Sequence, residues 1–525
     1  MIKIKALQPF KLCIIILLGC FSAASCQSND ESNIEVPFDN ASGEKIINLK
    51  IQENNIFQTI ENFGASDAWS AQFVGKWPEE KKNIIADLLF SKEIDQEGNP
   101  IGIGLSLWRF NLGAGSASQG AASGISDPWR RGESFIVPET GKYDWDKMQG
   151  QVWFANAAKS RGVEKLLLFT NSPPVTITRN GKAFTSDSNQ SNLSPEHYDE
   201  FADYLADVVE GLSKKGLHVD YISPVNEPQW DWTGGQEGTP FWNNEITRIV
   251  KALNSELINR NLTPKIDISE AGQINYLFEQ GNKPGRSEQI MDFFEPSSEN
   301  YVGNLEKIGH SISGHSYFTT SPYPSMISVR KMLKSEMESV PDLNYWMSEY
   351  CILGDNNGEI QGNGRDLGIN PALYLARVIH TDLTVAEASA WHWWTAISAY
   401  DYKDGLVYVD KNIENGNYYD SKMLWALGNF SRFIRPGSQR IQISSPDSSN
   451  KDFLFSAYKN PETGEKIIVI VNSKFDEIPV KLQDTSASSL EAYVTSSSKD
   501  LEKTDLNSQD IINIPSRSIV TLLLK

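Results

Sequence analysis

The strongest constraint on the fold is a unit that recurs eight times between residues 57 and 437, a short apolar run followed by an amphipathic helical pattern. The apolar runs lie near 60–65, 102–110, 164–170, 219–225, 264–269, 309–317, 343–349 and 387–395. The helical patterns lie near 78–91, 145–161, 195–216, 241–261, 286–298, 324–339, 371–382 and 420–433. Continuous apolar strands that alternate with helices indicate a parallel sheet covered on both faces. Eight such units predict an α/β fold, a (β/α)₈ barrel over residues 57–437.

An open, doubly wound sheet is the alternative arrangement of the same units. The first apolar run is not followed by the Gly-x-Gly-x-x-Gly pattern of dinucleotide-binding folds. That absence weakens the doubly wound alternative.

The sequence pattern changes after Pro436-Gly437, from alternating strands and helices to strands alone. The runs 453–458 and 467–471, separated by a Pro-Glu-Thr-Gly turn, predict a β-hairpin, and 519–524 predicts a further strand. We therefore expect a β-sandwich over residues 438–525. The strand-like segment 46–56, ahead of the barrel, is expected to pair into it.

The N-terminus has the pattern of an export signal. Three lysines precede the apolar run 13–18, and the small residues 22–25 end at Cys26. The run is too short to span a bilayer. Residues 1–26 resemble a bacterial lipoprotein signal in which Cys26 is acylated, and residues 27–45 are expected to form a polar tether. An ordinary cleaved signal is one alternative, and lipidation of Cys20 is another.

The resemblance implies an exported protein that is anchored by lipid to the bacterial outer membrane or the cell surface. Attachment at the periplasmic face of the membrane is an alternative. The protein's only expected membrane contact is the lipid. The net charge of −19 disfavours nucleic acid and tolerates neutral substrates. We expect a monomer.

The cysteines argue against a thiolate metal site. Three of the four lie in the first 26 residues, so Cys351 alone remains in the mature body, without an internal disulfide partner. We expect Cys351 to be a buried structural thiol. No His-Glu-x-x-His motif or calcium loop is present in the sequence, and no metal or organic cofactor is expected.

Two glutamates stand where predicted strands end. Glu227 follows the fourth apolar run through Asn226, and Glu349 ends the seventh. The catalytic residues of a (β/α)₈ barrel lie at these strand ends, and strands four and seven face each other across the barrel mouth. Retaining glycoside hydrolysis needs two carboxyl groups about 5–5.5 Å apart, a nucleophile and an acid/base. A salt bridge at the barrel rim is the alternative for either glutamate alone.

These residues resemble those of clan A glycoside hydrolases and, more narrowly, of glycoside hydrolase family 30. The resemblance covers about residues 45–525, including a β-sandwich built from both chain ends. The segments that carry it are 62–69, 107–113, 171–174, 226–228, 315–317, 348–351, 391–394 and 431–437. Segments 126–132 and 223–232 resemble the branch that contains endo-β-1,6-galactanases.

The resemblance and the chemistry together assign roles. Glu349 is the expected nucleophile, and the types of residue suited to keep it ionised are Arg109, His315 and Tyr317. Glu227 is the expected acid/base, with its pKa raised by the charge of Glu349.

The remaining site residues are expected to bind the sugar. Asn226 would hydrogen-bond the 2-hydroxyl. Asn171 stands on strand three, where many relatives carry a tryptophan ahead of Ser-Pro. Trp394 resembles the stacking platform of the family, with core packing as its alternative. Trp230 and Trp232 would line outer subsites or anchor loops.

The sequence thus predicts a retaining endo-β-1,6-galactanase-like enzyme that acts on polysaccharide or oligosaccharide. Two alternatives stay open. One is a family 30 enzyme on another β-glycan, a xylanase or a β-1,6-glucanase. The other is a surface glycan-binding lipoprotein without activity.

Overall fold

The computed structural model describes residues 46–446, 451–483, 489–508 and 510–525. The predicted signal peptide and tether, residues 1–45, lie outside these residues. None of the described helices combines the length and the apolar character needed to cross a membrane.

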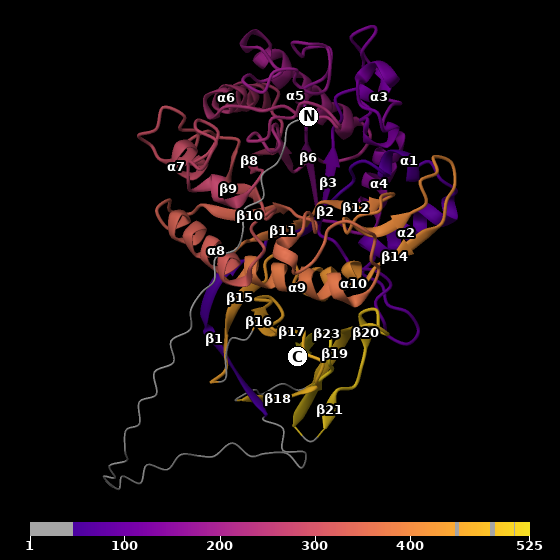
Figure 1. Cartoon of the computed structure of the whole chain (residues 1–525), viewed down its shortest axis with the longest axis vertical. Helices are drawn as coiled ribbons and strands as arrows, with labels where there is room; N and C mark the ends of the chain where they lie inside the picture. Colours follow the sequence, from indigo (N-terminus) through magenta and orange to yellow (C-terminus); the bar gives the residue numbers. More distant parts are fainter. Residues whose placement is uncertain (1–45, 447–450, 484–488, 509) are drawn as a thin grey trace, which may run out of the picture. The chain divides into compact units, whose positions relative to one another are not determined.

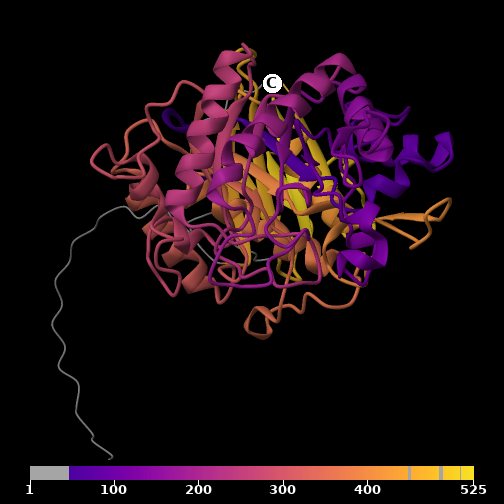
Figure 2. The ribbon, with the colours of Figure 1, turned by 90° about the horizontal axis from the view of Figure 1, so that it is seen from above.

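Eight parallel strands close into a barrel in the order β10-β11-β2-β3-β6-β7-β8-β9, which confirms the predicted fold. Their bounds are β2 (Asn62–Ser66), β3 (Leu107–Asn111), β6 (Lys165–Phe169), β7 (Tyr221–Ser223), β8 (Lys265–Ala271), β9 (Ile308–His315), β10 (Asn344–Glu349) and β11 (Ala390–Trp393). The strands are buried almost throughout, because helices cover the outside of the barrel. Figure 2 shows helices arranged around the strands.

The predicted helices are present within a few residues of their expected bounds. They are α2 (Glu79–Phe90), α4 (Gln149–Ser160), α5 (Tyr198–Lys214), α6 (Asn243–Asn259), α7 (Gln289–Phe294), α8 (Tyr323–Met337), α9 (Ile369–Thr384) and α10 (Lys422–Ser431). Short helices lie in the loops: α1 (Ala71–Val74), α3 (Ser116–Gln119), η1 (Gly120–Ser123), η2 (Pro128–Arg130), η3 (Pro195–His197), η4 (Ile274–Leu277) and η5 (Asn356–Gly358).

Several elements are shorter than predicted, and in two of them, β7 and α7, a proline follows the end closely. Strand β7 ends at Ser223, and Pro224 has no backbone N–H to donate to a ladder. Helix α7 ends at Phe294, because Glu295 precedes Pro296 and is held in extended backbone.

The second layer is a ten-stranded sheet built from both ends of the described chain, as predicted (Figure 1). Its strands are β1 (Ile47–Thr59), β15 (Gln439–Ser444), β16 (Phe453–Lys459), β17 (Lys466–Asn472), β18 (Ile478–Gln483), β19 (Leu490–Thr495), β20 (Glu502–Lys503), β21 (Asn507–Ser508), β22 (Ile511–Ile514) and β23 (Ser518–Leu524). Strand β1 lies antiparallel to β15 and parallel to β18.

Strand β17 shows how the sandwich and the barrel are joined. Ile468 and Ile470 face the apolar core of the sandwich, whereas Ile467, Val469 and Val471 belong to the core that continues into the barrel. Alternate side chains of a strand point to opposite faces, so one apolar run serves both cores. The β-sandwich and barrel therefore share a continuous hydrophobic interior.

Two small sheets lie outside these layers. One consists of β12 (Thr395–Ser398), β13 (Gly405–Val409) and β14 (Tyr418–Asp420), between β11 and α10, and the other of β4 (Ile136–Val137) and β5 (Lys142–Tyr143). The first was not predicted. Tyr402 and Asp404, in the loop between β12 and β13, border the cleft at the barrel mouth.

Candidate active site

A cleft of about 580 Å³ opens where the barrel strands end. The predicted site residues on its walls are Asn171, Asn226, Glu227, Tyr317, Glu349 and Trp394. Arg109 and His315 are fully buried, and their side chains contact the two glutamates from the interior of the barrel. The structure therefore brings all eight predicted residues together.

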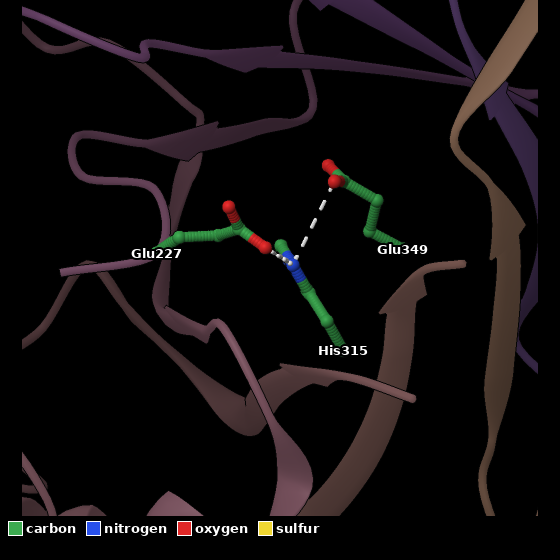
Figure 3. Close-up of side chains that lie close together, drawn as sticks. All are labelled: Glu227, His315 and Glu349. Atoms are coloured by element: carbon green, nitrogen blue, oxygen red, sulfur yellow. Dashed lines mark hydrogen bonds and ion pairs between the residues drawn. The ribbon is translucent and has the colours of Figure 1, made fainter. Parts of the chain in front are cut away.

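Glu227 and Glu349 point toward each other, with His315 between them (Figure 3). The Nδ1 atom of His315 lies 2.9 Å from Oε1 of Glu227 and 3.7 Å from Oε1 of Glu349. A carboxylate oxygen of each glutamate and a ring nitrogen of His315 all lie within 4.8 Å of one another. The two carboxylates therefore approach more closely than the distance of about 6.5–9.5 Å that separates the carboxyl groups of inverting glycosidases.

Two of the three predicted donors bind Glu349 directly. Nη1 of Arg109 donates to Oε2 at 3.0 Å, and the hydroxyl of Tyr317 donates to Oε1 at 3.1 Å. Burial and the charges of Glu227 and Glu270 raise the pKa of the Glu349 carboxyl, His315 and Arg109 lower it, and the resulting value is about 7.

His315 is held by carboxylates at both ring nitrogens, since Nε2 lies 2.9 Å from Oε2 of Glu270. Burial by itself lowers the pKa of His315, but Glu349, Glu227 and Glu270 outweigh it and raise the pKa to about 10. At neutral pH the ring is an imidazolium that donates to Glu227 and Glu270.

The same three side chains, Glu227, His315 and Glu349, are close enough to hold a metal ion. Both ring nitrogens of His315 lie 2.9 Å from carboxylate oxygens, Nδ1 from Glu227 and Nε2 from Glu270, so neither nitrogen is free to bind a metal in this arrangement.

Asn226 is the end of a chain of side-chain amides. Its Nδ2 donates to Oδ1 of Asn171 at 3.0 Å, and Nδ2 of Asn171 donates to Oδ1 of Asn111 at 3.3 Å. Oδ1 of Asn226 has no hydrogen-bond partner within the described part of the chain. The amide chain thus fixes the orientation of Asn226 beside Glu227 and leaves it an acceptor to offer.

The tryptophans divide into cleft and core residues. Trp394 borders the cleft and packs edge-on against Trp69, with ring centroids 5.3 Å apart. Trp393 is fully buried and donates from Nε1 to the backbone oxygen of Asp404, so it is a core residue. Trp230 and Trp232 both line the cleft. Nε1 of Trp232 also donates to the backbone oxygen of Glu227 at 3.0 Å and so anchors its loop as well.

The sequence interpretation missed Glu270 at the end of β8. This side chain is fully buried and contacts Arg109 and His315, the two cations that hold the glutamate pair. Its signal was a third carboxylate at the carboxyl end of an apolar run, Ile266-Asp267-Ile268-Ser269-Glu270. Cys351 is buried as predicted, and burial raises the pKa of its thiol well above the usual range.

A parallel eight-stranded barrel with two close carboxylates at its mouth is the arrangement of (β/α)₈ glycoside hydrolases. Residues 46–408 match the family described as O-glycosyl hydrolase family 30, and residues 437–522 match the glycosyl hydrolase family 30 β-sandwich domain. The chain belongs to glycoside hydrolase family 30.

Several relatives are similar over most of the chain. The crystal structure of a conserved exported protein from Bacteroides fragilis is 34% identical, with a TM-score of 0.86, and the alignment covers 91% of this chain and 100% of that one. An endo-β-1,6-galactanase of Hypocrea rufa is 24% identical, over 76% of each chain. A glucuronoxylanase of Bacillus subtilis is also 24% identical, over 67% of this chain and 70% of its own. The chain is thus a family 30 hydrolase of carbohydrate, and its relatives act on more than one glycan.

Proposed function

We propose that this family 30 hydrolase is a retaining endo-β-1,6-galactanase in which Glu349 is the nucleophile and Glu227 the acid/base. The observation that carries the assignment is the facing pair of carboxylates with the imidazole ring of His315 between them. The similarity to an endo-β-1,6-galactanase over 76% of the chain supports the substrate.

The geometry supports a double displacement. Arg109 and Tyr317 each donate to one oxygen of Glu349, so the carboxylate is held in place as it attacks the anomeric carbon. Glu227 protonates the departing glycosidic oxygen, and a glycosyl-enzyme ester forms on Glu349. Glu227 then removes a proton from water, which hydrolyses the ester and releases the product with its original anomeric configuration.

The sugar is bound by polar and aromatic groups of the cleft. The open acceptor of Asn226 suits the 2-hydroxyl, whose hydrogen bond strengthens in the oxocarbenium-like transition state. Trp394 offers an indole on the cleft wall for the C–H face of a pyranose. Trp230 and Trp232 extend the aromatic lining beyond Glu227, which favours a chain of sugars and therefore cleavage within it.

Two experiments test the proposal. Digests of β-1,6-galactan, xylan and β-1,6-glucan, with product sizing, identify the glycan and separate internal from terminal cleavage. Xylan or glucan as the preferred substrate would refute the galactan assignment and leave the enzyme class standing. Failure to cleave any glycan would favour a binding protein.

The second experiment traps the intermediate. A 2-deoxy-2-fluoro galactoside with an activated leaving group slows hydrolysis of the ester, so peptide mass spectrometry should find the sugar on Glu349. A label on any other residue would refute the role of Glu349. Proton NMR of the first product should show retained configuration.

We also propose export and acylation of Cys26, which the signal-like sequence of residues 1–26 supports. The similarity to an exported Bacteroides protein is consistent with export. Cys20 is the alternative lipidation site.

A further inference from the structure

Glu270 is the common partner of the two cations in the site. Its Oε1 accepts from Nη2 of Arg109 at 3.0 Å and from Oγ of Ser223 at 3.1 Å. Its Oε2 accepts from Nε2 of His315 at 2.9 Å and from Oγ of Ser348. These donors come from β3, β7, β9 and β10, so one carboxylate links four strands of the barrel.

Arg109 and His315 each connect Glu270 to the catalytic pair. Arg109 donates from Nη2 to Glu270 and from Nη1 to Glu349. His315 donates from Nε2 to Glu270 and from Nδ1 to Glu227. The backbone N–H of Glu227 also donates to the backbone oxygen of Glu270 at 2.8 Å. A change at Glu270 therefore affects both Glu227 and Glu349, although the Glu270 side chain lies behind the cleft and does not line it.

The charges of Arg109, His315 and the three glutamates cancel only when the glutamates together hold one proton. Arg109 and His315 carry two positive charges, and Glu227, Glu270 and Glu349 carry three negative charges when all are ionised. Uncompensated charge in a buried site is costly, so one proton on the glutamates gives the balanced state.

Other groups around Glu270 leave this balance unchanged. Asp267, on the same strand, is buried, and burial and the charge of Glu270 raise its pKa well above the usual range. Burial and the charge of Arg109 lower the pKa of His392 on β11 to about 3, so this ring is neutral. The remaining neighbours, Ser223, Ser313 and Ser348, are uncharged.

We propose that Glu270 is a positioning residue whose negative charge keeps His315 protonated and one proton on the Glu227–Glu349 pair. The inference rests on the proposed catalytic roles of that pair and adds a third carboxylate to them. Arg109 and His315 offset the charge of Glu270 and that of one further glutamate, so the other glutamate is left protonated. One protonated acid beside one ionised nucleophile is the starting state of a retaining mechanism.

Glu270→Gln tests the proposal. The amide keeps the size of the side chain and removes its charge, so Arg109 and His315 now balance two ionised glutamates. The pair should lose its proton at lower pH, and the basic limb of the kcat/KM profile should move down by about one to two pH units. The pKa of His315, read by ¹⁵N NMR and assigned with a His315→Asn variant, should fall by a similar amount.

Two further variants separate charge from packing. Glu270→Asp keeps the charge and should leave the basic limb near its wild-type position, even if kcat falls. Asp267→Asn changes a buried carboxyl of the same strand that accepts from Ser223, Ser311 and Ser313 and not from Arg109 or His315, so it should shift neither the limb nor the pKa of His315. Circular dichroism and Tm establish that each variant is folded.

The results that overturn the inference are equally definite. A Glu270→Gln enzyme with reduced kcat but an unmoved basic limb would show a packing role only. If His315 of the wild-type protein titrates below pH 7, the proposed role of Glu270 is refuted. This measurement needs no Glu270 variant, so it decides the question even if Glu270→Gln does not fold. Failure to label Glu349 with the fluoro sugar would contradict the proposed function, and the His315 titration would still decide the role of Glu270.

Discussion

Glu227→Gln is the sharpest test of the proposed acid/base. In the wild-type protein Oε1 of Glu227 accepts a hydrogen bond from Nδ1 of His315 at 2.9 Å. The amide oxygen of glutamine can accept the same bond, and the side chain has nearly the same volume. The substitution therefore removes proton transfer and little else.

The expected loss follows from that single function. General acid catalysis contributes roughly 10²–10⁴-fold, which is about 2.7–5.4 kcal/mol of transition-state stabilisation at 1.36 kcal/mol per decade. Cleavage of a natural glycan, with its poor leaving group, should fall by that factor. An aryl galactoside with an activated leaving group needs little protonation, so the first step on this substrate should be nearly unchanged.

The assay is stopped-flow release of the aryl group beside product analysis on the glycan. Water attack also needs Glu227 as base, so the glycosyl-enzyme on Glu349 should accumulate and give a burst of aryl product. Azide, which needs no base, should speed the second step. Equal losses on both substrates with no burst would show that Glu227 is not the proton donor.

Further perturbations probe the nucleophile, the anchor, the barrel and the pH response. Glu349→Ala should abolish turnover and leave the Tm nearly unchanged, and azide or formate should restore slow cleavage with inverted product; near-normal activity would refute its role. Cys26→Ala should release the protein from membranes into the soluble fraction, and a variant that stays bound would point to Cys20. Arg330→Met removes the buried guanidinium whose Nε lies 2.7 Å from Oδ1 of Asp382, and it should lower the free energy of unfolding by about 3–5 kcal/mol, measured as a lower Tm. A change in the free energy of unfolding below about 1 kcal/mol would contradict this. Since the folded pKa of His315 is raised from 6.5 to about 10, its contribution to stability is complete below about pH 6.5 and is lost as the pH rises to 10. The Tm should therefore fall across that range, and less steeply in His315→Asn.

The barrel was predictable because its signals are local. Runs such as Leu166-Leu167-Leu168-Phe169 can be buried on both sides only in a covered parallel sheet, and each is followed by a helix-length amphipathic segment. The β12–β14 sheet was not predictable in this way. It interrupts the last strand-to-helix connection, and β13 pairs with segments on either side of it rather than with the barrel.

The proximity of the two glutamates was predictable for a different reason. Glu227 follows the end of β7 by four residues, Glu349 is the last residue of β10, and the barrel topology places strands four and seven across its mouth. In the structure burial raises the pKa of Glu349, and the charges of Glu227 and Glu270 raise it as well. These charges form one cluster with Arg109 and His315. That cluster includes Glu270, whose partners come from four strands and share no sequence spacing.

The backbone nevertheless distinguishes Glu270 in the same way as the proposed acid/base. Glu227 has φ +45° and Glu270 has φ +50°, a left-handed conformation that costs a residue other than glycine about 1–2 kcal/mol. They lie at the ends of the adjacent strands β7 and β8, and the N–H of Glu227 donates to the backbone oxygen of Glu270. Strain of this kind persists where the surrounding contacts hold it, and it gathers at functional sites. A glycine at position 270 would relieve the strain, yet it would leave Arg109 and His315 without their shared carboxylate. A strained glutamate at this position is the outcome expected if its charge governs the proton of the pair.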